Sequence, residues 1–209
     1  MDAVLFFKES KQVNKLRSRL EYVLKHAQGK HAEVVESFLS FYNKKGHISP
    51  AQESYFENIE KYYTPAALGV KAAWHKGYSD YHRDVAVKCA KYYAKTMYFQ
   101  GLVQKVLSDP QTHFLTERQF NKMCNNKYAL KILKEYDSPP AFKKGEFVQV
   151  RAQSKLPLER DSVAVIIESD AAPITVARKG ARVYSILPVG ATSLHLAHES
   201  ELKKARKFK

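Results

Sequence analysis

Lysine and arginine recur at spacings of three and four residues along several stretches of the chain, which would place them on one face of a helix. These spacings hold for Lys8, Lys11, Lys15 and Arg19 and for Lys88, Lys91 and Lys95. A third group, Lys122, Lys127, Lys131 and Lys134, is dense on the helix expected after Thr116. Such faces would neutralise phosphates along a nucleic-acid backbone and release bound counterions. The alternative is that each row is an ordinary solvated helix face, because acidic residues such as Glu9, Glu21 and Asp84 are interspersed.

Aromatic residues are the second group that could bind a ligand, since the chain has 13 Tyr, 11 Phe and one Trp. Adjacent rings such as Tyr98 and Phe99 diverge by about 100° on a helix, so often only one of them can face the core. An exposed ring among lysines could stack on the bases of a single strand. The first candidate for a stacking site is the segment of Trp74, His75 and Lys76. The alternative is that these rings cap the edge of a core.

The whole chain is strongly basic, with 35 Lys and Arg against 21 Asp and Glu, a net charge of +14. Further candidate contacts flank the C-terminal third, and these are Lys143, Lys144, Lys203, Lys204 and Arg206. Such a surface seeks polyanions. Composition does not choose among DNA, RNA, an anionic membrane and an acidic protein.

Other groups that could do chemistry are weak. Cys89 and Cys124 lack the close spacing of a zinc knuckle and are too few for a disulfide framework, so we expect reduced thiols. The sequence contains no Gly-rich phosphate loop and no nucleophile elbow. We therefore expect no metal, no other cofactor and no enzymatic activity.

The elements that must position these residues change in character along the chain. Up to residue 137, apolar residues follow helical spacing and predict a long helix from about Asp80 to Leu107 among shorter ones. Ser49 and Thr116 each carry a Gln three residues later and predict N-terminal capping boxes. The two boxes could mark an internal duplication, or they could be unrelated, because such boxes are common.

The consecutive prolines Pro139 and Pro140 cannot continue a helix and predict a boundary between domains of residues 1–137 and 138–209. After them, short β-rich runs separated by turn residues predict about five strands. The expected strands are 147–150, 163–167, 174–176, 183–187 and 194–196, and a short helix is expected over 199–206. We therefore predict an α+β protein, with a multi-helix N-terminal domain followed by a small β-barrel and a short C-terminal helix.

The segment Lys143-Lys144-Gly145-Glu146-Phe147-Val148-Gln149-Val150 resembles the opening strand of SH3-like small barrels of the KOW and Tudor kind. This resemblance covers about a third of the chain. It implies a binding module that holds nucleic acid or protein. In its lysine- and tyrosine-rich style, the whole chain resembles accessory nucleic-acid-binding proteins of large DNA phages.

These observations favour a non-enzymatic nucleic-acid-binding protein, with DNA slightly favoured over RNA. The alternative is an adaptor that docks on an acidic surface of a larger machine such as a polymerase or a ribosome. No apolar run reaches the roughly 18 residues that span a bilayer, and residues 1–27 lack a secretory signal pattern. We therefore expect no membrane partner and an intracellular, soluble protein in the cytoplasm or nucleoid of a host cell.

Overall fold

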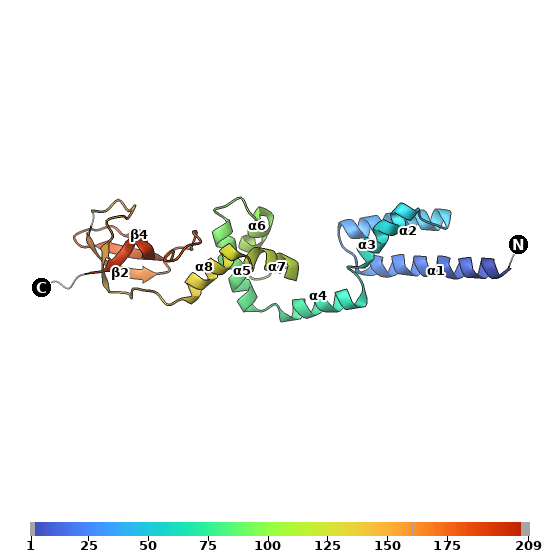
Figure 1. Cartoon of the computed structure of the whole chain (residues 1–209), viewed down its shortest axis with the longest axis horizontal. Helices are drawn as coiled ribbons and strands as arrows, with labels where there is room; N and C mark the ends of the chain where they lie inside the picture. The colour runs from blue at the N-terminus through green and yellow to red at the C-terminus, as the bar shows by residue number, and fades with distance from the viewer. Residues whose placement is uncertain (1–2, 160, 206–209) are drawn as a thin grey trace. The chain divides into compact units, whose positions relative to one another are not determined.

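A computed structural model describes residues 3–159 and 161–205, with side chains described from residue 15 onward. The chain divides into two compact units, residues 1–75 and 76–209. The first unit is helical, whereas the second contains helices and an antiparallel sheet, so the protein belongs to the mixed α+β class (Figure 1). The change from helix to sheet falls at Pro139 and Pro140, as the sequence predicts, and it lies inside the second unit.

The helices of the first unit are α1 (Ala3–His26), α2 (Lys30–Lys45), α3 (Pro50–Glu60) and the start of α4 (Pro65–Gly77), which extends past its boundary. The turn between α1 and α2 uses Gly29 at φ 55°, a conformation that costs other residues strain. The helical spacing of apolar residues predicted for this part of the chain is confirmed in α1, whose apolar stripe includes Leu20, fully buried in one cluster with Val35 and Phe56. Its burial explains the apolar spacing of that helix.

Both predicted capping boxes are present. The hydroxyl of Ser49 accepts from the Gln52 amide at 3.2 Å, and the Gln52 side chain accepts from the Ser49 amide at 2.8 Å. Thr116 and Gln119 repeat the pair of bonds at 3.3 and 3.0 Å at the start of α7. Each box satisfies two amides that the first helical turn leaves unpaired.

The helices of the second unit are α5 (Asp80–Tyr93), α6 (Gln100–Ser108), α7 (Glu117–Cys124) and α8 (Lys127–Asp137). The prediction of one helix from Asp80 to Leu107 is wrong, because the chain leaves the helix after Tyr93. The Thr96 hydroxyl donates to the Tyr93 carbonyl at 3.0 Å and replaces a helical partner there. Helix α6 then folds back against α5, which explains why apolar spacing continues through the break.

The strands are β1 (Phe147–Val150), β2 (Val163–Ser169), β3 (Val183–Pro188), β4 (His195–His198) and β5 (Leu202–Lys204). They form one antiparallel sheet in the order β4-β3-β2-β1-β5. Within the described residues this sheet is open, with β4 and β5 at its edges. A closed barrel is therefore not confirmed.

Two predicted elements near the sheet are wrong. Residues 174–176 form no strand, because the Ile174 amide bonds to the Tyr136 hydroxyl at 3.0 Å and its side chain packs with Ile132. The expected helix over 199–206 is instead the 3-10 turn η1 (Glu199–Glu201) followed by β5. Leu202 is buried in the sheet core, which favours a strand over a helix at this point.

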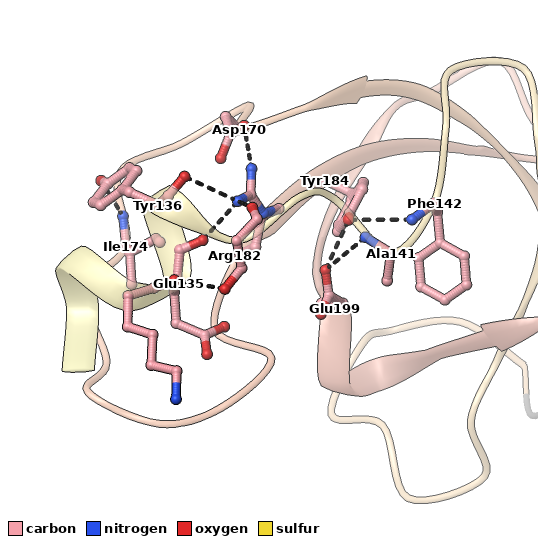
Figure 2. Close-up of polar contacts among 11 residues, drawn as sticks. Glu135, Tyr136, Ala141, Phe142, Asp170, Ile174, Arg182, Tyr184 and Glu199 are labelled. Carbon is pink, nitrogen blue, oxygen red and sulfur yellow. Dashed lines mark hydrogen bonds and ion pairs between the residues drawn. The ribbon is translucent and has the colours of Figure 1, made fainter.

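A buried arginine joins α8 to the sheet, as Figure 2 shows. The Arg182 side chain is 4% exposed, and its guanidinium lies 2.5 Å from Asp170. It donates to the carbonyls of Glu135 at 2.6 Å and Tyr136 at 3.3 Å, and also to that of Ser138. These carbonyls lie at the C-terminal end of α8 and have no helical amide to accept from. The Arg182 guanidinium donates to them instead, and its positive charge stabilises the negative end of the helix dipole.

A second network fixes the entry to β1. The Tyr184 hydroxyl donates to the Glu199 carboxylate at 2.8 Å and accepts from the Phe142 amide at 3.4 Å (Figure 2). Burial, and then the bond to Glu199, raise the pKa of Tyr184. The same carboxylate accepts from the Ala141 amide at 3.2 Å. The segment after Pro140 is therefore held to β3 and η1.

Candidate nucleic-acid interface

In the first unit, the predicted row on α1 does not form a free cationic face over its described part. Lys8 and Lys11 lie outside the described side chains, and Lys15 is exposed. Arg19 binds Glu60 through two bonds of 2.9 and 2.7 Å, which lower the pKa of Glu60. The guanidinium carbon of Arg19 also lies 5.4 Å from the Phe56 ring centroid. The partners of this charge are therefore side chains of the same unit.

The predicted stacking segment lies where the two units divide. Trp74 is half-buried, while His75 and Lys76 are exposed. Tyr78, two residues further on, is buried with its ring 4.8 Å from that of Phe114. Tyr78 therefore belongs to the core of the second unit and offers no face to a ligand.

The prediction that Lys88, Lys91 and Lys95 form a row on one helix is wrong for Lys95, because α5 ends at Tyr93 and Lys95 lies in the turn that follows. Lys88 is 2.6 Å from Asp84 and lies over the Tyr136 ring at 5.2 Å, so its charge has local partners. Lys91 and Lys95 are exposed. The same-face spacing that indicated a cationic row also places Asp84 one turn before Lys88, where it forms the ion pair.

The row on α8 is exposed along its length. Lys127, Lys131 and Lys134 all face solvent, whereas Ala129 and Ile132 on the other side are fully buried. The packing of that apolar side orients the three lysines outward together. Lys122 is also exposed, but the prediction of one helix after Thr116 that carries all four lysines is wrong, because α7 ends at Cys124 and Asn126 caps a new helix that begins at Lys127.

A basic pocket of about 490 Å³ lies beside the end of α8. The side chains that line it come from α8 and from the loop between β2 and β3, and they are Lys131, Lys134, Glu135, Ser138, Arg178 and Lys179. Glu135 accepts from the amides of Gly180 at 2.8 Å and Ala181 at 3.3 Å. The lining therefore contains four cationic side chains and one carboxylate, that of Glu135, one oxygen of which accepts two backbone hydrogen bonds.

Arg178 and Lys179 were missed by sequence reasoning, which gave the segments between the expected strands only a turn role. Gly180 has φ 70°, and an added Cβ would lie 3.1 Å from the backbone and side chain of Ser200. The turn is therefore tight, and it brings its two cations beside α8. The sequence signal that could have indicated these two residues was a pair of adjacent cations directly before a glycine.

An aromatic pocket of about 300 Å³ lies where the α5–α6 turn meets α7 and α8. The residues that line it are Tyr93, Tyr98, Phe99, Lys122, Asn126, Lys127 and Tyr128. Lys127 lies 5.0 Å from the centroid of the Tyr128 ring. Sequence reasoning singled out the Tyr98 and Phe99 pair but placed the stacking site elsewhere, because only folding brings α8 against this turn.

Around the sheet, the predicted cations differ in their surroundings. Lys143 and Lys144, just before β1, and Lys204 in β5 are exposed. Lys203 forms an ion pair with Asp161. Arg206 lies outside the described residues.

The cationic character belongs mainly to the second unit. Residues 76–209 contain 24 Lys and Arg against 13 Asp and Glu, whereas residues 1–75 contain 11 against 8. In the part of the chain that the structure describes, no helix has the length and apolarity needed to cross a membrane. Nor do the described side chains of His, Cys, Asp and Glu, those of residues 15–159 and 161–205, gather in threes that could hold a metal ion.

Comparison with known proteins gives no relative, since no family model, curated protein or solved structure matches the chain.

Proposed function

We propose that this protein is a non-enzymatic nucleic-acid-binding protein, and that its second unit contacts the phosphate backbone. The observation that carries this proposal is the basic pocket, where Lys131, Lys134, Arg178 and Lys179 converge from two separate elements. Among the described residues, the one carboxylate that lines it is that of Glu135, whose Oε2 accepts from two backbone amides. The four cations outnumber this one carboxylate, so the lining carries a net positive charge that would attract an anion.

The exposed lysines of α7 and α8 would extend this contact along a strand. Lys127, Lys131 and Lys134 occupy successive turns of one helix face, so they span about 10 Å at 1.5 Å per residue. Phosphates of one DNA strand recur every 3.4 Å along the helix axis, so such a row reaches several of them. Lysines contact phosphates as point charges and carry no base readout, which favours binding without sequence specificity.

The sheet is the proposed second binding module, of the SH3-like kind. Strand β5 returns to pair with β1 beyond η1, so the last strand lies next to the first. The register of β2 against β3 shifts between Ile166 and Glu168, a bulge that bends the sheet. These features support a sheet that coils toward a barrel. Its exposed Lys143, Lys144 and Lys204 would add phosphate contacts.

The test is a fluorescence-anisotropy titration of the full chain with duplex DNA, and with RNA for comparison, at several salt concentrations. The test variant is the double substitution Lys131→Gln with Lys134→Gln. The control, Lys44→Gln with Lys45→Gln, removes two exposed lysines from the last turn of α2. Each lost phosphate contact should lower the salt slope on duplex DNA by about 0.9, so the test variant should lose roughly 1.8 and the control nothing.

Equal slopes for the test variant and the control would show that the basic pocket does not contact the backbone. Binding of the unmodified chain no tighter than about 10⁻⁴ M at physiological salt would contradict nucleic-acid binding altogether.

The second candidate function is an adaptor that docks on an acidic protein surface. It is favoured by apolar side chains exposed on the sheet. Phe147 of β1, shortly after the exposed Lys143 and Lys144, is 54% exposed, and Leu196 of β4, the edge strand on the other side of the sheet from β5, is 55% exposed. Substitution of Phe147 and Leu196 by Ser would then abolish partner binding, while the lysine variants of α8 would leave it unchanged.

A further inference from the structure

The aromatic pocket is built on a backbone conformation that needs an explanation. Phe99, which begins α6, has φ 58° and ψ 22°, the left-handed region that a bulky residue rarely occupies. The Gln100 side chain donates to the Tyr93 carbonyl at 3.4 Å and to the Thr96 carbonyl, and these bonds hold the turn. The strained turn places Phe99 in the wall of the pocket and Tyr98 at 71% exposure. Strain of this kind gathers at ligand sites.

The pocket has an aromatic wall and a fixed floor. Tyr93 is 3% exposed, its ring lies 4.8 Å from that of Phe99, and its hydroxyl donates to the Asn126 side chain at 2.9 Å. Asn126 also caps α8 by accepting from the amides of Tyr128 and Ala129. The floor is therefore rigid, and the rings that remain exposed are Tyr98 and Tyr128, the latter at 48%.

Two lysines lie at the rim of these rings. Lys122 and Lys127 are exposed and line the pocket, and within the described residues the lining contains no carboxylate. Aromatic faces beside cations suit a flat π-system joined to a negative charge, which is the chemistry of a nucleobase with its phosphates. The volume of about 300 Å³ is at the lower end for ligand pockets, so it suits one such group.

We propose that the aromatic pocket stacks one unpaired nucleobase against Tyr98 and Tyr128, while Lys122 and Lys127 contact the adjacent phosphates. This inference rests on the proposed function and specifies its substrate as single-stranded nucleic acid. Bases within a duplex are stacked on one another and present no free face, so a duplex reaches only the phosphate contacts. DNA and RNA strands share the recognised chemistry.

The test uses full-length protein and three fluorescein-labelled oligonucleotides of equal length, a DNA strand, an RNA strand and a DNA strand with abasic sugars in place of its nucleosides. The abasic strand keeps the phosphates and removes the stacking partners. We expect the protein to bind it roughly 5- to 150-fold more weakly than the normal DNA strand, the loss associated with one stacked base. Comparable affinity for the RNA and normal DNA strands would mark the base rather than the sugar as the recognised group, and a preference between them would identify the natural strand.

The matched variants are Tyr98→Ala and its control Tyr81→Ala. Both side chains are 71% exposed, and Tyr81 lies on α5 away from the residues that line the pocket. Tyr98→Ala should weaken binding of the normal strand by a similar roughly 5- to 150-fold, while Tyr81→Ala should not change it. Tyr98→Phe, which keeps the ring, should restore the affinity, and Tyr98→Ala should have no effect on the abasic strand.

Equal affinity for normal and abasic strands, or an equal effect of Tyr98→Ala and Tyr81→Ala, would overturn the stacking proposal. Salt-dependent binding to duplex DNA would still stand in that case, so the proposed function would survive. If neither the single strands nor duplex DNA bound the protein, the stacking proposal and the proposed nucleic-acid-binding function would both be overturned.

Discussion

Replacement of Arg182 by alanine should loosen helix α8 from the sheet within the second unit. The guanidinium binds Asp170 and three carbonyls of the helix end, and its side chain is 4% exposed. The substitution removes every one of these bonds. It leaves the carbonyls of Glu135, Tyr136 and Ser138 without the donor that replaces their missing helical partners.

The expected cost follows from the burial of the cation. Loss of one partner of a buried, hydrogen-bonded charge costs about 3–5 kcal/mol. The lower half of that range applies here, because Asp170 is 43% exposed and water can hydrate it after the substitution. With a urea m-value of about 2 kcal/mol per M, a loss of about 3 kcal/mol lowers the unfolding midpoint by roughly 1.5 M.

The measurement is urea unfolding followed by circular dichroism, together with hydrogen exchange of the α8 and β3 amides. Arg182→Lys keeps the charge, but a single ammonium cannot reproduce the planar fork, so it should recover only part of the loss. Arg178→Ala, an exposed cation in the same loop, is the control and should change stability by no more than about 0.5 kcal/mol. A midpoint for Arg182→Ala equal to that of the control would refute the proposed role of the bonds.

Three further outcomes are expected from the same unfolding assay. Tyr184→Phe should destabilise the second unit by about 1–3 kcal/mol, since the Glu199 carboxylate loses its buried donor; an unchanged midpoint would contradict this. Gly180→Ala should cost about 1–3 kcal/mol, because φ is 70° and the added Cβ would crowd η1; no loss would show that the loop can shift. In the first unit, the bond from Arg19 lowers the pKa of Glu60, so the stability from this pair is present above the ordinary value of about 4.3 and is lost as the pH falls through the lower folded value. Arg19→Met should remove that part of the pH dependence of stability. Identical profiles of stability against pH for the variant and the unmodified protein would contradict a stabilising role of the Arg19–Glu60 pair.

The local features of the fold were predictable from sequence, because they depend on neighbouring residues. The hydroxyl caps at Ser49 and Thr116 need only a Gln three residues later. The stripe of α1 and the strands beginning at Phe147, Val163 and Val183 follow from apolar spacing. The break after Tyr93 was not predictable in this way. Helices α5 and α6 pack on each other, so the helical spacing of apolar residues continues from one into the other.

The end of the chain shows the limit of periodicity. Residues near Leu202 read as a short helix, yet they form η1 and β5, because Leu202 pairs with Val150 and is buried in the core of the sheet. Ile174 reads as part of a strand but is held by Tyr136 and a small buried cluster. In both cases a contact distant in sequence decided the local conformation.

The sequence by itself determined the basic charge of this protein, its helical and β-rich segments, and the outward row of lysines on α8, because each of these depends on composition or on spacing along one element. Only the tertiary structure decided which cations have partners distant in sequence. It placed Glu60 on Arg19 from 41 residues away and brought Arg178 and Lys179 to α8. It also joined Tyr98 to Tyr128 in one pocket. Charge neutralisation and ring clustering depend on distances in space, and spacing along the chain fixes those distances only within a single helix or strand.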